Sequence, residues 1–199
     1  MNLFEYQAKE AFRECGITTP RGVLVRSVEE LDAAFAETGF PCVLKSQVLR
    51  GGRGKAGLIR MVGDAETGKR EAGELFASAH NVRMLLVEQA VDIAREIYLS
   101  ITVDPVTGTA LLMGCAEGGV DIESLAATQP EKIVRVHVDM AEGLGGYHVN
   151  NLIYGMGLSG EEAKQVGAAA RGLYKVFRAC DAQLAEINPL FITSDGQAV

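Results

Sequence analysis

Several features that mark common protein classes are scarce or missing in this sequence of 199 residues. No apolar run approaches the roughly 18 residues of a membrane span, and residues 1–5 lack the basic and apolar regions of a signal peptide. The four cysteines form no C-x-x-C pair, and the three histidines show no metal-ligand spacing, which argues against a zinc site. We therefore expect a cytoplasmic protein with free thiols and no membrane partner.

Positive charge is also scarce overall. The formal net charge is −7, which argues against non-specific nucleic-acid binding. Against this acidic background, the cations between residues 45 and 55 form a local basic cluster. The length suffices for one large domain or two small ones.

The most informative segment follows a short apolar run. Lys45 ends the run, and the sequence GGRGKAG follows at 51–57. Glycine lets backbone N–H groups approach a ligand closely and converge on an anion. Arg53 and Lys55 add positive charge, so the segment predicts a polyphosphate site.

Several glycine-rich loops have to be distinguished. Residues 58–62 read as a strand, whereas a dinucleotide-binding loop opens a helix. A Walker loop needs Ser or Thr where Ala56 stands. Protein kinases place their lysine after the loop and carry H-R-D and D-F-G, which are missing here. A lysine before the loop indicates the ATP-grasp group; the structural alternative is a solvated hairpin turn.

Two strand ends carry oxygen-bearing side chains. Glu186 and Asn188 are two residues apart, so a strand would place both on one face, where they suit Mg²⁺. Glu88 ends an apolar strand, and it or Glu96 could accept ribose hydroxyls. In both places ordinary strand-end residues remain the alternative.

The pattern of elements predicts an α+β fold. Helices are expected near 3–15, 28–38, 64–79, 149–154 and 161–180. Strands are expected near 23–25, 42–45, 58–62, 84–88, 96–103, 109–113 and 133–138, with a pair at 184–187 and 190–193 around Asn188-Pro189.

Together these motifs resemble the β subunit of succinyl-CoA synthetase. The matching segments are MNLFEYQAK at 1–9, GGRGKAG at 51–57, LVE at 86–88, DIARE at 92–96, EGGVDIE at 117–123 and EINPL at 186–190. The resemblance covers the whole chain and corresponds to the family's N-terminal nucleotide-binding region. It implies an ATP-grasp fold with two α+β subdomains, 20–105 and 1–19 plus 106–199, and a CoA-ligase domain missing from this sequence.

The resemblance also implies roles for single residues. Lys45, Gly52, Arg53 and Gly54 would hold the nucleotide phosphates. Glu88, Val91 and Glu96 would bind base and ribose. Asn188 would be one Mg²⁺ ligand, with a second, an Asp, expected beyond residue 199. Glu186 would be the catalytic acid that faces a phosphohistidine of the α subunit. Pro20 stands where the family's base preference is set, and the resemblance implies that it would favour ATP over GTP.

The implied reaction is that of an ADP-forming ligase of the tricarboxylic acid cycle. ATP, succinate and CoA would give ADP, phosphate and succinyl-CoA through the partner's phosphohistidine, although a chain without the CoA domain should bind nucleotide without ligase turnover. Three alternatives stay open. They are a malate–CoA ligase or ATP-citrate lyase-like subunit, a non-catalytic docking module that uses 117–123, and an ATP-grasp ligase that joins an acid to an amine.

Overall fold

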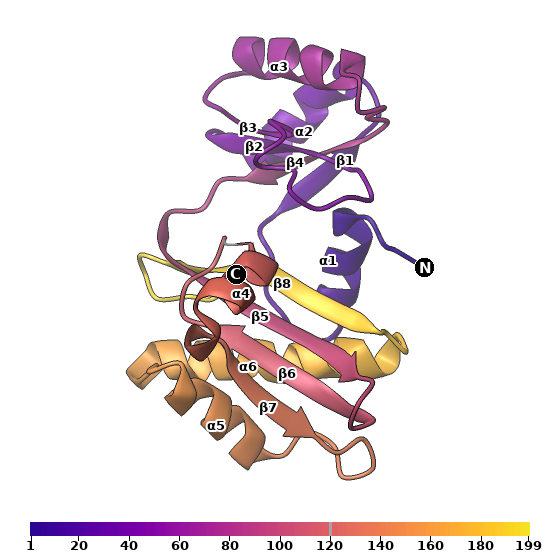
Figure 1. The fold of residues 1–199 in the computed structure, drawn as a ribbon. Helices are drawn as coiled ribbons and strands as arrows, with labels where there is room; N and C mark the ends of the chain where they lie inside the picture. The colour runs from indigo at the N-terminus through magenta and orange to yellow at the C-terminus, as the bar shows by residue number, and fades with distance from the viewer. Residues whose placement is uncertain (120) are drawn as a thin grey trace. The chain divides into compact units, whose positions relative to one another are not determined.

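The computed structural model describes residues 1–119 and 121–199 of the chain (Figure 1). Contacts divide these residues into two compact units. The first comprises Met1–Glu10 and Thr19–Val91, and the second comprises Ala11–Thr18 and Asp92–Val199. The limits expected from the sequence, 20–105 against 1–19 plus 106–199, differ from this division at residues 1–10, 19 and 92–105.

The first unit is an antiparallel sheet with helices on it. The strands run in the order β1-β4-β2-β3. Their bounds are β1 Gly22–Val25, β2 Cys42–Ser46, β3 Ile59–Val62 and β4 Leu85–Gln89. The helices are η1 Val28–Glu30, α2 Leu31–Thr38 and α3 Ala65–Ala77.

One apolar core holds this unit together. Leu31 and Phe35 of α2 and Leu75 of α3 pack with strand residues such as Leu44 and Val87. Asp64 begins α3 as a capping residue, because its carboxylate accepts a hydrogen bond of 2.8 Å from the Thr67 amide. The shared core and the backbone pairing of the two strands hold β2 and β4 side by side, as the site described below requires.

The second unit is another antiparallel sheet, ordered β7-β6-β5-β8. Its strands are β5 Ile93–Asp104, β6 Thr109–Cys115, β7 Val134–Val138 and β8 Leu184–Thr193. The helices are α4 Ile122–Thr128, η2 Pro130–Lys132, α5 Gly146–Gly155 and α6 Gly160–Ala179. Helix α1, Glu5–Glu14, contributes residues to both units.

The two faces of this sheet carry different helices. Leu99 and Leu112 point toward the large core with α5 and α6, which contains Leu152 and Leu173. Tyr98 and its cross-strand neighbour Cys115 point the other way, into a smaller cluster with Leu125 of α4. Side chains alternate along each strand, so this division follows from the pleat.

One expectation about the strands was wrong. The segments 184–187 and 190–193 do not pair around Asn188-Pro189 but form one strand, β8, which pairs along β5. Proline has no N–H to give to a ladder. The register of β5 against β8 accordingly shifts between Ile97 and Leu99, opposite this dipeptide, and the strand continues beyond it.

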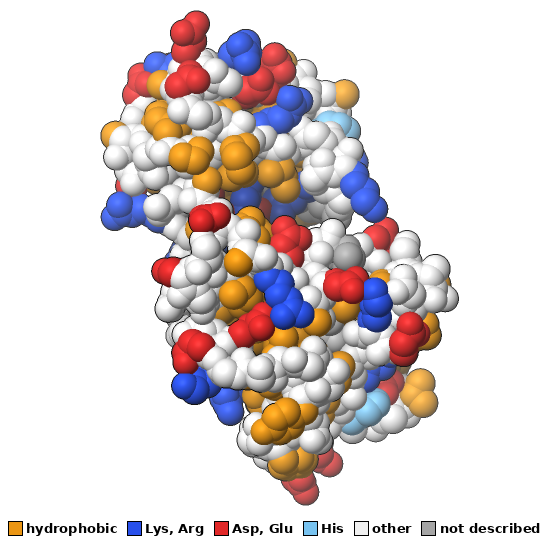
Figure 2. Space-filling model, turned by 90° about the vertical axis from the view of Figure 1, so that its left-hand side faces the viewer, with side chains coloured by type: hydrophobic (Ala, Val, Ile, Leu, Met, Phe, Trp, Pro, Cys, Tyr) orange, Lys and Arg blue, Asp and Glu red, His pale blue; other side chains and the backbone are white. Residues whose placement is uncertain are grey.

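Charged side chains of both signs are intermixed on the face shown in Figure 2. Among residues 1–119 and 121–199, no helix combines the length and the apolar character needed to cross a membrane.

Candidate functional site

The site in the first unit is built around Lys45, in strand β2. Its side chain is 13% exposed and forms ion pairs with two carboxylates. Glu88 of the adjacent strand β4 contacts the Lys45 ammonium directly, and the Glu5 Oε1 atom of α1 lies 3.3 Å from Lys45 Nζ. The register explains the first contact, since β2 and β4 are hydrogen-bonded neighbours that pair Lys45 with Leu86 and Val43 with Glu88.

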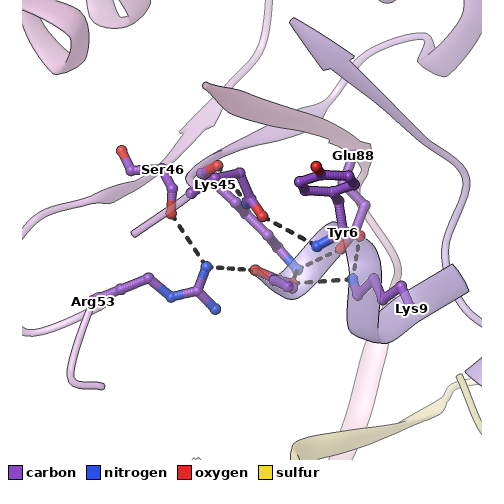
Figure 3. Close-up of polar contacts among 8 residues, drawn as sticks. Tyr6, Lys9, Lys45, Ser46, Arg53 and Glu88 are labelled. Carbon is purple, nitrogen blue, oxygen red and sulfur yellow. Dashed lines mark hydrogen bonds and ion pairs between the residues drawn. The ribbon is translucent and has the colours of Figure 1, made fainter. Parts of the chain in front are cut away.

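Glu88 is the most deeply buried of these charged groups. Its side chain is 3% exposed and lies between the ammonium groups of Lys45 and Lys9 (Figure 3). A buried carboxylate needs such partners, because removing an unpaired charge from water is costly. The structure thus shows the Glu88 side chain as a counter-ion for two lysines, and its predicted contact with base or ribose stays a prediction.

Arg53 reaches the same cluster from the glycine loop. Its Nη1 atom lies 2.6 Å from Glu5 Oε2 and donates a hydrogen bond of 3.2 Å to the Ser46 carbonyl oxygen (Figure 3). Glu5 Oε1 also lies 3.1 Å from the Nζ atom of Lys9, one helical turn further along α1. Glu5 therefore lies within ion-pair distance of all three cations.

A further side chain fixes α1 against the sheet. Gln47 is buried, and its Oε1 atom accepts a hydrogen bond of 3.1 Å from the Tyr6 amide. Its Nε2 atom donates one of 2.9 Å to the Lys45 carbonyl. The start of α1 is thus tied to the strand that carries Lys45.

The electrostatics follow from this crowding. Burial alone raises the pKa of Glu5, but Lys45, Lys9 and Arg53 outweigh it and hold the pKa at about 2. Burial lowers the pKa of Lys45, yet Glu5 and Glu88 outweigh it and raise the pKa above its ordinary value. Burial and the neighbouring Lys45 lower the pKa of Lys9. Lys45 and Glu5 are therefore firmly ionised at neutral pH.

The glycine loop joins β2 to β3, as predicted. Gly52 and Gly57 have φ angles of +70° and +67°, a region that favours glycine. Two backbone hydrogen bonds within the loop form turns. The Ala56 amide donates to the Gly52 carbonyl at 3.1 Å, and the Leu58 amide donates to the Arg53 carbonyl at 2.9 Å. Leu58 is buried in the core and anchors the end of the loop. Gly54 lies at the exposed turn between these anchors.

The remaining predicted nucleotide contacts lie in different units. Val91 is the last residue of the first unit. Glu96 belongs to β5 of the second unit, and its carbonyl accepts a hydrogen bond of 2.8 Å from the Gly118 amide. A side chain at Gly118 would meet the Glu96 backbone at 2.7 Å, so this close approach requires glycine. The predicted roles of Val91 and Glu96 stay predictions.

The acidic segment 117–123 is largely engaged locally. Asp121 caps α4 by accepting a hydrogen bond of 3.2 Å from the Ser124 amide, and Glu117 forms an ion pair of 2.7 Å with Lys132. Val120 lies outside the described residues. Glu123 is exposed. The docking role predicted for this segment stays a prediction.

Glu186 and Asn188 share one face of β8, as the spacing predicted. Partial desolvation raises the pKa of Glu186, a hydrogen bond with Asn188 opposes the shift, and the Glu123 carboxylate adds to it. These groups offer hard oxygen donors. Among the described residues, no group of three or more His, Cys, Asp or Glu side chains gathers into a metal site. A carboxylate with an amide fits Mg²⁺, which usually takes few protein ligands beside phosphates.

Sequence reasoning missed Glu5, Lys9 and Gln47. The signal for the first two lay in the helical period: Glu5, Lys9 and Phe12 stand at i, i+4 and i+7, and Phe12 is buried. Charged side chains on the apolar stripe of a helix indicate a buried ionic contact. The partner strands could not be named, because they lie about 40 and 80 residues away in the sequence.

Comparison with known proteins supplies the family. The ATP-grasp domain family matches residues 2–192. Subunit SauC of the ADP-forming sulfoacetate-CoA ligase of Bilophila wadsworthia is 76% identical over 199 residues, which are 100% of this chain and 53% of that protein. The β subunit of the ADP-forming succinate–CoA ligase of Rubrobacter xylanophilus is 44% identical over 202 aligned residues, with the same coverage.

A solved structure agrees with the fold. The dinucleotide-forming acetyl-coenzyme A synthetase 1 of Ca. Korarchaeum cryptofilum superimposes with a TM-score of 0.78 at 17% identity, over 99% of this chain and 89% of that one. The chain spans about half the length of the curated relatives it matches. The two sheets with their helices, the glycine loop preceded by a buried lysine and the match over residues 2–192 lead to one conclusion: the chain belongs to the ATP-grasp domain family.

Proposed function

We propose that this chain is the nucleotide-binding part of an ADP-forming acid–CoA ligase. The observation that carries the proposal is the pair of largely buried cations, Lys45 and Arg53, held beside a glycine loop in an ATP-grasp chain. The similarity to ligase subunits over the whole chain supports the reaction class. ATP with Mg²⁺ is the expected nucleotide substrate.

The favoured acid is sulfoacetate rather than succinate. The chain is 76% identical to a sulfoacetate-CoA ligase subunit and 44% identical to a succinate–CoA ligase subunit. This shifts the preference away from the succinate expected on family resemblance. Succinate remains the second candidate, because the relatives that act on it also match the chain from end to end.

The work of the proposed site is positioning and charge neutralisation. Lys45 and Arg53 would offset charge on the β- and γ-phosphates, and the loop amides would add dipoles. Asn188 would hold Mg²⁺, which supplies further charge neutralisation at the phosphates. Glu186 would face a phosphohistidine on a partner α subunit, where a carboxylate orients the imidazole.

A labelled-phosphate assay tests this proposal. The subunit that contains this chain is combined with its partner subunit and given ATP labelled at the γ-phosphate. We expect acid-labile label on a partner histidine, lost in Lys45→Ala and kept in Lys69→Ala, which removes an exposed cation paired with Asp32. Adding CoA with either acid should discharge the label faster with sulfoacetate. Two outcomes would contradict the proposal. One is that no label appears on the partner subunit, and the other is that an amine acceptor stimulates ATP cleavage in the absence of the partner subunit.

A further inference from the structure

A carboxylate of this chain forms ion pairs with Lys45 and Arg53, the two cations that we propose to bind phosphate. Glu5 Oε2 lies 2.6 Å from Arg53 Nη1, and Glu5 Oε1 lies 3.3 Å from Lys45 Nζ. Both cations are mostly buried, with side chains 22% and 13% exposed, so the ion pairs are poorly screened by solvent. A phosphate that approaches these cations therefore meets a fixed negative charge.

The two carboxylates of the cluster differ in how firmly they are held. Glu88 lies on a strand between two other strands, is 3% exposed and has both ammonium groups as partners. Glu5 is the first residue of α1 and is 17% exposed. Glu88 is thus the more deeply buried counter-ion, whereas Glu5 lies closer to solvent, at the first residue of its helix.

Both members of the Glu5–Arg53 pair have a second partner. Lys9 lies 3.1 Å from Glu5 and can keep its carboxylate paired. The Arg53 guanidinium also donates to the Ser46 carbonyl at 3.2 Å, which holds it near β2. Separation of the pair therefore leaves the Glu5 carboxylate paired with Lys9, and it leaves the Arg53 charge in place for a phosphate oxygen.

We propose that the Glu5 carboxylate is an internal stand-in for a phosphate group of the nucleotide. When a nucleotide binds, its phosphates displace Glu5 from Arg53 and Lys45, and the carboxylate stays paired with Lys9. The proposal rests on the proposed nucleotide site. Three cations face two carboxylates in the cluster, so it carries one net positive charge until the polyphosphate arrives. Glu5 keeps the cations ordered and lowers the affinity for phosphate groups.

The test compares nucleotide binding by two variants of α1. Glu5→Gln keeps the shape and removes the charge, and Glu10→Gln makes the same change at an exposed position of the same helix. Calorimetric titration of the 199-residue chain with Mg²⁺ and ATP should show about tenfold tighter binding in Glu5→Gln and no change in Glu10→Gln. Adenosine should bind all three proteins equally. In an Arg53→Gln background, the gain from Glu5→Gln should shrink.

The outcomes separate the two proposals. Saturable ATP binding that Glu5→Gln leaves unchanged or weakens overturns the stand-in role and spares the nucleotide site. Failure of the unsubstituted chain to bind ATP overturns both. If Glu5→Gln unfolds at the assay temperature, the ¹³C carboxyl resonance of Glu5 in the unsubstituted chain gives a second readout. ATP should shift it and adenosine should not, and a resonance unmoved at saturating ATP also overturns the role.

Discussion

Glu88 and Glu186, two glutamates on strands of different units, have opposite surroundings. Glu88 is 3% exposed and lies between the ammonium groups of Lys9 and Lys45. Glu186 is exposed, lies beside the Asn188 amide and feels the Glu123 carboxylate, and its pKa is raised. One acid is neutralised by two cations of the chain itself, whereas the other is exposed beside an amide and a second acid. The environment, not the residue type or the strand, decides which role a carboxylate takes.

The sharpest way to break this comparison is Glu88→Gln. The substitution leaves two largely buried ammonium groups without their shared carboxylate, so we expect a loss of about 3–4 kcal/mol of folding free energy. Urea unfolding at pH 7 measures it. Glu37→Gln is the matched control, since Glu37 lies 3.9 Å from Arg21 and is 53% exposed. That control should cost less than about 0.5 kcal/mol. Equal losses in the two variants would contradict the buried role of Glu88.

The next effect is the acid dependence that Glu5 confers. The pKa of Glu5 falls from its ordinary 4.5 to about 2, so the folded form binds its proton more weakly than the unfolded form. The contribution, about 3 kcal/mol, is fully present above the ordinary pKa and is lost as the pH falls through 2. Unfolding free energies at several pH values should therefore show a shallower acid loss in Glu5→Gln than in the unsubstituted chain. Parallel curves for Glu5→Gln and the unsubstituted chain would contradict the paired state of Glu5.

The smallest effect on stability is expected for Glu186→Gln. A raised pKa means that the ionised carboxylate is disfavoured in the folded chain, so its contribution is greatest at low pH and declines as the pH rises through the raised pKa. At pH 7 the Glu186→Gln variant should be as stable as the unsubstituted chain, or its free energy of unfolding should be larger by less than about 1 kcal/mol. ATP binding should persist, while phosphoryl transfer to the partner should be lost. If Glu186→Gln lost as much stability as Glu88→Gln, the two acids would be equally important to folding, which would contradict the contrast drawn between their surroundings.

The sequence predicted most elements because their signals are local. The helix near 64–79, the strand that leads into Lys45 and the glycine loop each have their signals within a few residues, and the structure contains all three. The i, i+2 spacing also placed Glu186 and Asn188 together. The sequence did not predict the ion-pair partners of Lys45. Glu5 and Glu88 lie about 40 residues away on either side and contact Lys45 only through tertiary packing.

The sequence did not predict that β8 is one continuous strand, for a related reason. Asn188-Pro189 has the composition of a turn, and a turn would have paired the flanking segments with each other. The long strand β5 offers partners on both sides of the dipeptide, and a register shift absorbs the missing N–H. Tertiary pairing thus overrides a local turn signal.

The most direct measurement is calorimetric titration of the chain with ATP and Mg²⁺, beside Lys45→Ala and Lys69→Ala. Lys45 is the cation on which the buried cluster centres, whereas Lys69 pairs with Asp32 at 2.7 Å and is 42% exposed. We predict saturable binding that Lys45→Ala abolishes and Lys69→Ala leaves intact. Binding that survives Lys45→Ala in a folded protein would place the phosphates elsewhere and contradict the assignment of this cluster.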